Sequence, residues 1–242
     1  MREILNQHKD SFLAKRGQVI KEDRRTAITL FEFAGKRICV KEYRYKSIGL
    51  KLKELLRGSK ARKGWMKGNE ILKRGIKGIN PVALLEKRRW GYLQEAFLIM
   101  ETHPNFVELR RYVKDIFGDP QQGFVKKKAF IKELAVFLAK LNCLRIAHRD
   151  LKISNILVKE VDNSWCFALT DWEDLELDKQ ITGKRLIKTL VQMNTSTPLF
   201  VSLRDRSRFL KQYLTLIGRD DIKTVYREVI RWSEKRGWVN LI

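Results

Sequence analysis

Short runs of alternating apolar and polar residues predict β-strands in the early part of the chain. One strand includes Val19 and Ile20, and others are predicted over residues 27–33, 37–43, 82–87 and 95–101. Two more, over residues 155–158 and 165–170, flank a polar turn.

Apolar residues spaced three and four apart predict helices later in the chain. The clearest case is residues 124–143, where lysines separate apolar positions: Phe130, Leu134, Phe137, Leu138 and Leu141. Residues 184–193, 206–217 and 222–232 show the same periodicity. Strands therefore dominate the early part and helices the late part, which favours an α+β fold.

The link between helix 124–143 and the next strand carries the kinase catalytic-loop pattern H-R-D-x-x-x-x-N. It reads His148-Arg149-Asp150-Leu151-Lys152-Ile153-Ser154-Asn155. An Asp in this pattern can accept the proton of an attacking hydroxyl, and the Asn can bind magnesium. Lys152 can neutralise charge on the moving phosphoryl group. We therefore predict Asp150 and Lys152 as catalytic residues and Asn155 as a metal ligand.

The segment after strand 165–170 stands where kinases have D-F-G. It reads Asp171-Trp172-Glu173-Asp174, so Asp171 is the candidate ligand of the magnesium ion that bridges the nucleotide phosphates. Trp172 could take the packing role of the Phe. Glu173 and Asp174 have no counterpart in D-F-G.

A kinase also needs a strand lysine that grips the phosphates and a helix glutamate that pairs with it. Lys41, in the alternating strand 37–43, fits the first role. Glu70 is the only acidic residue between Leu55 and Leu85, so by elimination it is the candidate partner. Two glycines within residues 62–74 cost about 1 kcal/mol each in a helix, which predicts a short or mobile helix there.

The nucleotide site shows one kinase-like feature and lacks another. Residues 100–105, which include Glu101, resemble the hinge where backbone groups hold adenine, so Glu101 is a candidate ATP-binding residue. No G-x-G-x-x-G motif is present, and the turn over residues 22–25 carries Arg24 and Arg25 instead. Phosphate binding should therefore depend on Lys41, the metal and these arginines.

The order of four motifs resembles the lipopolysaccharide core kinases, the family of Kdo and heptose kinases, from about Val19 to Leu214. These motifs are Val40-Lys41, residues 58–65, residues 74–83 and the H-R-D loop. The resemblance implies a two-lobed protein-kinase-like fold, with a β-rich lobe over residues 1–102 and a helical lobe over residues 103–242. It also implies that ATP and Mg²⁺ are used to phosphorylate a Kdo or heptose of the lipopolysaccharide inner core, on the cytoplasmic face of the inner membrane.

One segment departs from the family pattern. Many members read Arg-Glu-Trp in the helix that supplies the glutamate, whereas this chain reads Lys63-Gly64-Trp65. The departure suggests a divergent branch whose acceptor differs.

The charge balance predicts a polyanionic partner. The chain has 51 Lys and Arg against 28 Asp and Glu, a net charge of +23. Ten cations surround the predicted glutamate helix with only Glu54 and Glu70 among them: Lys51, Lys53, Arg57, Lys60, Arg62, Lys63, Lys67, Lys73, Arg74 and Lys77. Lipopolysaccharide phosphates and an anionic membrane surface fit this charge, and nucleic acid is a less favoured alternative.

Other features bear on location. The chain shows no signal peptide and no run of about 20 apolar residues, so we expect a cytoplasmic protein that binds the membrane peripherally. Its three scattered cysteines argue against disulfides or a zinc site.

Two other function classes remain open. A protein Ser/Thr or Tyr kinase would use the same residues, although the chain lacks A-P-E and a long activation segment. A tRNA-associated atypical kinase, or an inactive RNA-binding module, would also explain the charge. RNA binding that is sensitive to salt and survives Asp150→Ala would identify the last.

Overall fold

The computed structural model describes residues 1–13, 18–45, 54, 58–76, 78–103, 105–118, 123–162 and 164–237. The chain forms two units. The first comprises Met1–Pro104 and Asp171–Glu173, and the second comprises Asn105–Thr170 and Asp174–Ile242. The sequence did not indicate that Asp171–Glu173 belongs with the first unit.

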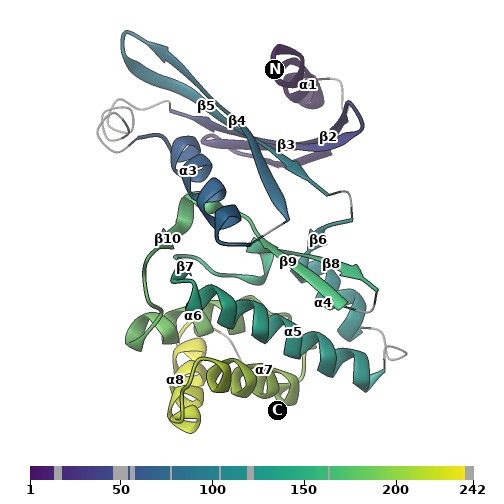
Figure 1. The fold of residues 1–242 in the computed structure, drawn as a ribbon, viewed down its shortest axis with the longest axis vertical. Helices are drawn as coiled ribbons and strands as arrows, with labels where there is room; N and C mark the ends of the chain where they lie inside the picture. The colour runs from purple at the N-terminus through teal and green to yellow at the C-terminus, as the bar shows by residue number, and fades with distance from the viewer. Residues whose placement is uncertain are drawn as a thin grey trace. The chain divides into compact units, whose positions relative to one another are not determined.

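The first unit contains a five-stranded antiparallel sheet in the part of the chain that the structure describes (Figure 1). The strand order is β1-β2-β3-β5-β4. Its elements are α1 (Arg2–Leu13), β1 (Gln18–Glu22), β2 (Thr26–Phe33), β3 (Lys36–Arg44), α3 (Lys60–Lys73), β4 (Ile79–Arg89) and β5 (Tyr92–Thr102). The strands predicted here are confirmed, with β4 and β5 longer than expected.

Helices α1 and α3 cover opposite faces of the sheet. Ile38 and Val40 of β3 pack in a core with Ile4 of α1. Side chains alternate along a strand, so Cys39 and Lys41 point to the other face, where α3 lies.

A buried polar contact fastens α1 to the sheet. The ring nitrogens of His8 lie 2.6 Å from Thr29 Oγ1 and 3.3 Å from Glu42 Oε2. Glu42 also accepts two hydrogen bonds from Arg44, each 2.9 Å long. Burial raises the pKa of Glu42, but the hydrogen bonds from His8 and Arg44 outweigh it and lower this pKa to about 2.

Helix α3 is continuous over 14 residues, although its two glycines predicted a short helix. Ser59 caps it by accepting a hydrogen bond from the Arg62 backbone N–H at 2.9 Å. Gly64 and Gly68 are buried at places where a side chain would force its neighbours to shift. A Cβ on Gly64 would lie 2.8 Å from Leu98, and one on Gly68 would lie 2.3 Å from the Trp172 ring. The glycines therefore allow close packing.

The second unit is mostly helical. Its elements are β6 (Val107–Glu108), α4 (Leu109–Gly118), α5 (Phe124–Cys143), β7 (Ile146–His148), η1 (Ile153–Asn155), β8 (Ile156–Val161), β9 (Ser164–Leu169), β10 (Leu175–Leu177), α6 (Gly183–Ser196), α7 (Leu203–Leu216) and α8 (Ile222–Glu234). The short helix η2 (Trp172–Asp174) crosses the boundary between the units. Helix α5 has the predicted bounds, and the three later helices are confirmed.

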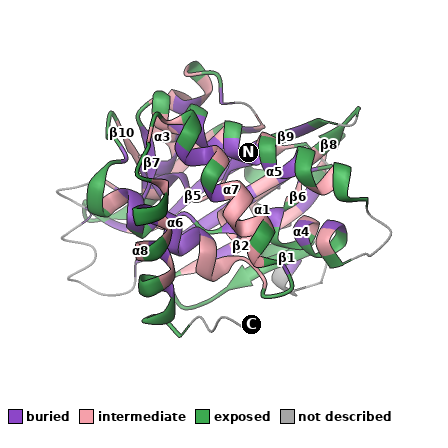
Figure 2. Ribbon diagram, turned by 90° about the horizontal axis from the view of Figure 1, so that it is seen from below, coloured by how far each residue is buried: buried purple, intermediate pink, exposed green. Residues whose placement is uncertain are grey.

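Aromatic packing holds α5 against the small sheet of β6, β8 and β9. The Phe130 ring of α5 lies 5.3 Å from that of Trp165 and 5.9 Å from that of Phe167, between centroids. Helix α8 is amphipathic: Val225 and Val229 are buried, whereas much of its ribbon is exposed (Figure 2). No helix among the described residues is long and apolar enough to span a membrane.

Candidate active site

The catalytic-loop pattern lies between β7 and β8 of the second unit, and His148 fixes its start. The Asp150 backbone N–H donates to His148 Nδ1 at 3.1 Å. Because Nδ1 accepts, Nε2 carries the proton and donates to the Thr170 carbonyl at 3.2 Å. This buried histidine therefore ties the backbone at Asp150 to the end of β9.

The Asp150 carboxylate is held from two sides. Lys152 Nζ donates to Oδ2 at 2.8 Å, and Gln192 Nε2 of α6 donates to Oδ1 at 2.9 Å. Gln192 also donates to the Arg149 carbonyl at 3.2 Å. The Asp150 side chain remains 42% exposed, so a hydroxyl can approach it.

Asn155 closes the loop. Its Nδ2 donates to the Asp150 carbonyl at 2.8 Å, which leaves Oδ1 as the atom that can bind a metal. The Thr170 N–H donates to the Asn155 carbonyl at 3.0 Å, next to the paired residues Ile156 and Leu169.

Asp171 follows Thr170 directly and belongs to the first unit. Its φ of 53° lies in the left-handed region, which Asp tolerates better than most residues. Such backbone strain is frequent at functional sites.

Lys41 binds two carboxylates of that segment. Its Nζ lies 2.6 Å from Asp171 Oδ1 and 2.7 Å from Glu173 Oε1. The Lys41 and Glu173 side chains are 9% and 10% exposed, whereas that of Asp171 is 37% exposed. The cluster thus contains one buried cation, one buried carboxylate and one accessible carboxylate.

The electrostatics of the cluster keep Lys41 charged. Burial lowers the pKa of Lys41, but the Glu173 and Asp171 carboxylates outweigh it and raise this pKa above the ordinary value. Burial, followed by the Glu173 charge, raises the pKa of Tyr43 well above its ordinary value. The Lys41 Nζ also lies 5.4 Å from the centre of the Tyr43 ring.

The structure does not bring Glu70 to Lys41. Glu70 accepts from Arg74 Nε at 3.0 Å across one turn of α3. The reason is helical geometry: Gly68 faces Trp172, and Glu70 lies two residues further, about 200° around the helix. Glu173 takes the position beside Lys41 that Glu70 was expected to fill.

Glu101 lies at the end of β5, paired with Ile38 and Asn80 of the neighbouring strands. Its side chain forms an ion pair with Lys36 at 3.0 Å. Its contact with adenine stays a prediction.

Sequence reasoning missed two residues of the site. Glu173 was left without a role because D-F-G has no acidic residue there. Gln192 lies on a predicted helix, 42 residues from Asp150, without a motif around it. The one signal in the sequence was that an acidic residue, Glu173, stands two positions after Asp171.

The surroundings of the candidate metal ligands bear on whether they could hold an ion. The described residues contain no cluster of three or more His, Cys, Asp or Glu side chains suited to a metal ion. The Asp171 carboxylate and the Asn155 amide oxygen are hard oxygen donors, as Mg²⁺ prefers. Each is therefore of the chemical kind that can bind such an ion.

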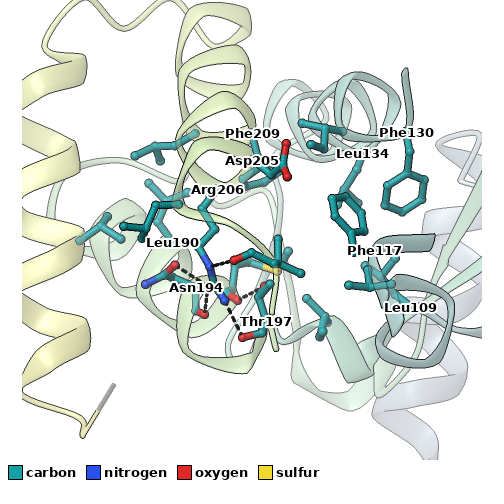
Figure 3. Close-up of a pocket in the computed structure, with 18 of the residues that line it drawn as sticks. Leu109, Phe117, Phe130, Leu134, Leu190, Asn194, Thr197, Asp205, Arg206 and Phe209 are labelled. Carbon is teal, nitrogen blue, oxygen red and sulfur yellow. Dashed lines mark hydrogen bonds between the residues drawn. The ribbon is translucent and has the colours of Figure 1, made fainter. Parts of the chain in front are cut away.

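An apolar cavity lies in the second unit beside the catalytic loop (Figure 3). Ile153 lines it together with residues of α4, α5, α6, α7 and α8, among them Val113, Phe130 and Leu190. Its space, counted out to the open mouth, is ≈ 810 Å³. Arg206 closes one side by donating to Asn194 and to the Thr197 carbonyl, and burial lowers the pKa of this arginine to about 10.

The chain was compared with known proteins. Residues 10–213 match the model of the lipopolysaccharide kinase (Kdo/WaaP) family. A solved structure described as "WaaP in complex with acyl carrier protein" is similar, with a TM-score of 0.66 and 19% identity over 94% of this chain and 90% of that chain. A search of curated proteins found no match.

These findings confirm two expectations from the sequence. The structural likeness confirms the α+β, protein-kinase-like fold with a β-rich first part and a helical second part. The family match covers most of the chain and confirms the resemblance that the motifs carried. The chain therefore belongs to the lipopolysaccharide kinase (Kdo/WaaP) family, whose members are phosphotransferases that act on alcohol groups of lipopolysaccharide core sugars.

Proposed function

We propose that the protein transfers the γ-phosphate of ATP to a hydroxyl of a Kdo or heptose in the lipopolysaccharide inner core. The observation that carries the proposal is the ordered catalytic loop, in which His148, Asn155 and Gln192 fix the backbone and carboxylate of Asp150. A kinase of this fold works chiefly by positioning and charge stabilisation, and such a loop provides both.

In this proposal Asp150 accepts the proton of the attacking sugar hydroxyl. Its carboxylate oxygens accept one hydrogen bond each from Lys152 and Gln192, and each keeps a further lone pair for that proton. Lys152 lies near enough to stabilise negative charge on the transferred group.

Lys41 and Asp171 bind the nucleotide phosphates and Mg²⁺. Asp171 is the exposed carboxylate of the Lys41 cluster and is the proposed metal ligand, with Asn155. Mg²⁺, when bound, would neutralise charge on the phosphates. The side chain of Lys41 remains held by buried Glu173 while Asp171 binds metal.

Glu173 therefore takes the role that a helix glutamate has in many family members. Gly64 stands at the position of that glutamate. A Cβ there would lie 4.0 Å from Glu173 Oε2, so the Glu173 carboxylate lies close to the space that a residue 64 side chain would enter. The carboxylate that orients Lys41 has thus moved from α3 to the segment after Asp171.

The remaining parts of the nucleotide site are also proposals. The backbone around Glu101 would hold adenine, and exposed Arg24 and Arg25 at the β1–β2 turn would face the phosphates. The net charge of +23 supports action at an anionic membrane surface, where lipid-linked acceptors reside.

The function is tested by offering labelled ATP and Mg²⁺ with three acceptors: lipopolysaccharide inner-core glycolipid, a generic peptide and tRNA. We expect label on the glycolipid, and its loss in Asp150→Ala. Label on peptide alone would identify a protein kinase. Salt-sensitive tRNA binding without any transfer would identify an RNA-binding module.

An acyl carrier protein is a second proposed partner. The similar structure is described as WaaP in complex with an acyl carrier protein, a name that denotes a carrier of an acyl chain. The cavity beside Ile153 is lined mainly by apolar side chains, which suit an acyl chain. We propose that it receives an acyl chain.

Val113→Phe should partly fill this cavity. We expect it to weaken binding of the acylated carrier protein roughly tenfold and to leave the weak binding of the unacylated form unchanged, as measured by calorimetric titration. Unfolding temperature serves as the control for folding. Equal affinity of the wild type for both carrier forms would contradict an acyl site.

A further inference from the structure

The β4–β5 hairpin ends in an exposed tip with an unusual residue. Arg89 pairs with Tyr92, and the two-residue turn between them is Trp90-Gly91. Trp90 has φ 54° and Gly91 has φ 78°, as in a type I′ turn. Trp90 is 86% exposed, the highest value among the large apolar side chains that the structure describes.

Neither backbone conformation nor packing accounts for Trp90. A type I′ turn favours Asn, Asp or Gly at its first central position, because side chains of other residues are strained at positive φ. The exposed ring gains little from burial within the unit. A partner that buries the ring would explain why a tryptophan stands there.

Cations surround this tip. Lys87, Arg88 and Arg89 lie on the hairpin and are exposed. The start of α3 lies beside the same end, because the Lys60 N–H donates to Tyr45 Oη at 3.1 Å and the Tyr45 N–H donates to the Gln94 carbonyl at 3.0 Å.

The start of α3 adds two further exposed cations, Lys60 and Arg62. Glu86 pairs with Arg88 at 2.7 Å and Glu95 with Lys87 at 3.6 Å, so among the described residues five cations have ion pairs with these two carboxylates alone. The tip surface, defined as Lys60, Arg62, Lys87, Arg88, Arg89, Trp90 and Tyr92, is thus both cationic and aromatic.

We propose that the tip surface is a membrane-docking site that inserts Trp90 and Tyr92 among the headgroups of an anionic bilayer. Tryptophan and tyrosine favour the membrane–water interface, because they join an apolar ring to a polar group. Each cation near an anionic leaflet strengthens binding by about fivefold. This inference rests on the proposed membrane location, and the tip surface is the part of the protein that would contact the membrane.

The test measures flotation with vesicles of phosphatidylglycerol and phosphatidylcholine, and with vesicles of phosphatidylcholine alone. We expect binding to the anionic vesicles only, weakened by salt. Trp90→Asn should reduce it roughly tenfold. Asn suits the turn, so this variant should unfold at the same temperature as the wild type or higher. Trp232→Ala, which removes an exposed tryptophan from α8, should bind like the wild type.

Two outcomes would overturn the proposal. One is full vesicle binding by Trp90→Asn, which would place membrane contact elsewhere on the chain. The other is that Trp90→Asn loses affinity for single-stranded RNA while it keeps its affinity for vesicles. That result would make the tip surface a nucleic-acid site. Asp150→Ala should bind vesicles normally, so a failure of docking is distinguishable from a failure of the proposed kinase function.

Discussion

At the scale of single residues, Lys41 and Glu173 decide how the nucleotide site is held. Both side chains are buried and their charged atoms lie 2.7 Å apart, so removing either one leaves the other charge less compensated in the protein interior. Asp171 shares the same ammonium but is far more exposed. This difference separates a carboxylate that orients Lys41 from one that can turn to a metal.

Replacing Glu173 should therefore weaken nucleotide binding by more than any loss of folding stability would account for. In Glu173→Gln, Asp171 is the one carboxylate partner that Lys41 keeps among the described residues, so Lys41 would compete with Mg²⁺ for Asp171. We expect kcat/KM for ATP to fall roughly tenfold or more and the Mg²⁺ concentration for half-maximal rate to rise. Glu173→Asp should recover part of the loss.

Glu70→Gln provides the comparison, because Glu70 pairs with Arg74. Its effect on kcat/KM should be smaller than that of Glu173→Gln. A larger loss of kcat/KM in Glu70→Gln than in Glu173→Gln would show that Glu70 of α3, and not Glu173, is the partner of Lys41. Adding Gly64→Glu to Glu173→Ala should restore some activity, once the Leu98 side chain shifts to make room.

At the scale of elements, α3 supports the site through its backbone rather than through an acidic side chain. Gly64 and Gly68 let the helix approach Leu98 and Trp172, and Lys67 Nζ donates to the Glu173 carbonyl at 3.0 Å. Helix-propensity scales rank glycine as unfavourable in a helix because they take no account of tertiary neighbours. The tertiary contact reverses that interpretation.

Gly68→Ala tests this packing. A Cβ would lie 2.3 Å from Trp172 Cε3, so we expect destabilisation of about 1–3 kcal/mol, measured by thermal unfolding, and a raised KM for ATP. Gly118→Ala at the end of α4 is the matched control, since its Cβ would meet nothing within 4 Å. Equal unfolding temperatures for Gly68→Ala and wild type would show that α3 does not pack as described.

At the scale of the whole molecule, the sequence predicted what depends on local pattern. The catalytic loop, helix 124–143 and the strand that bears Lys41 were all identified, because motif spacing and periodicity are local properties. The Lys41–Glu173 pair spans 132 residues and the Asp150–Gln192 contact spans 42. No periodicity encodes such pairs, so the fold itself was needed.

The distribution of charge shows the same limit. The sequence placed the excess of cations around α3, and four of them, Lys51, Lys53, Arg57 and Lys77, lie outside the described residues. Only the structure joins Lys60 and Arg62 to the hairpin tip through Tyr45. The sequence could predict that the protein binds polyanions, but it could not predict which surface binds them.

The most direct measurement follows the γ-phosphate itself. Inner-core glycolipid is incubated with Mg²⁺ and ATP carrying ¹⁸O in its γ-phosphate, and tandem mass spectrometry locates the label in the product. The account predicts one labelled phosphate on a Kdo or heptose hydroxyl with the wild type and none with Asp150→Asn. Labelled glycolipid formed equally by Asp150→Asn, or no labelled glycolipid with the wild type, would contradict it.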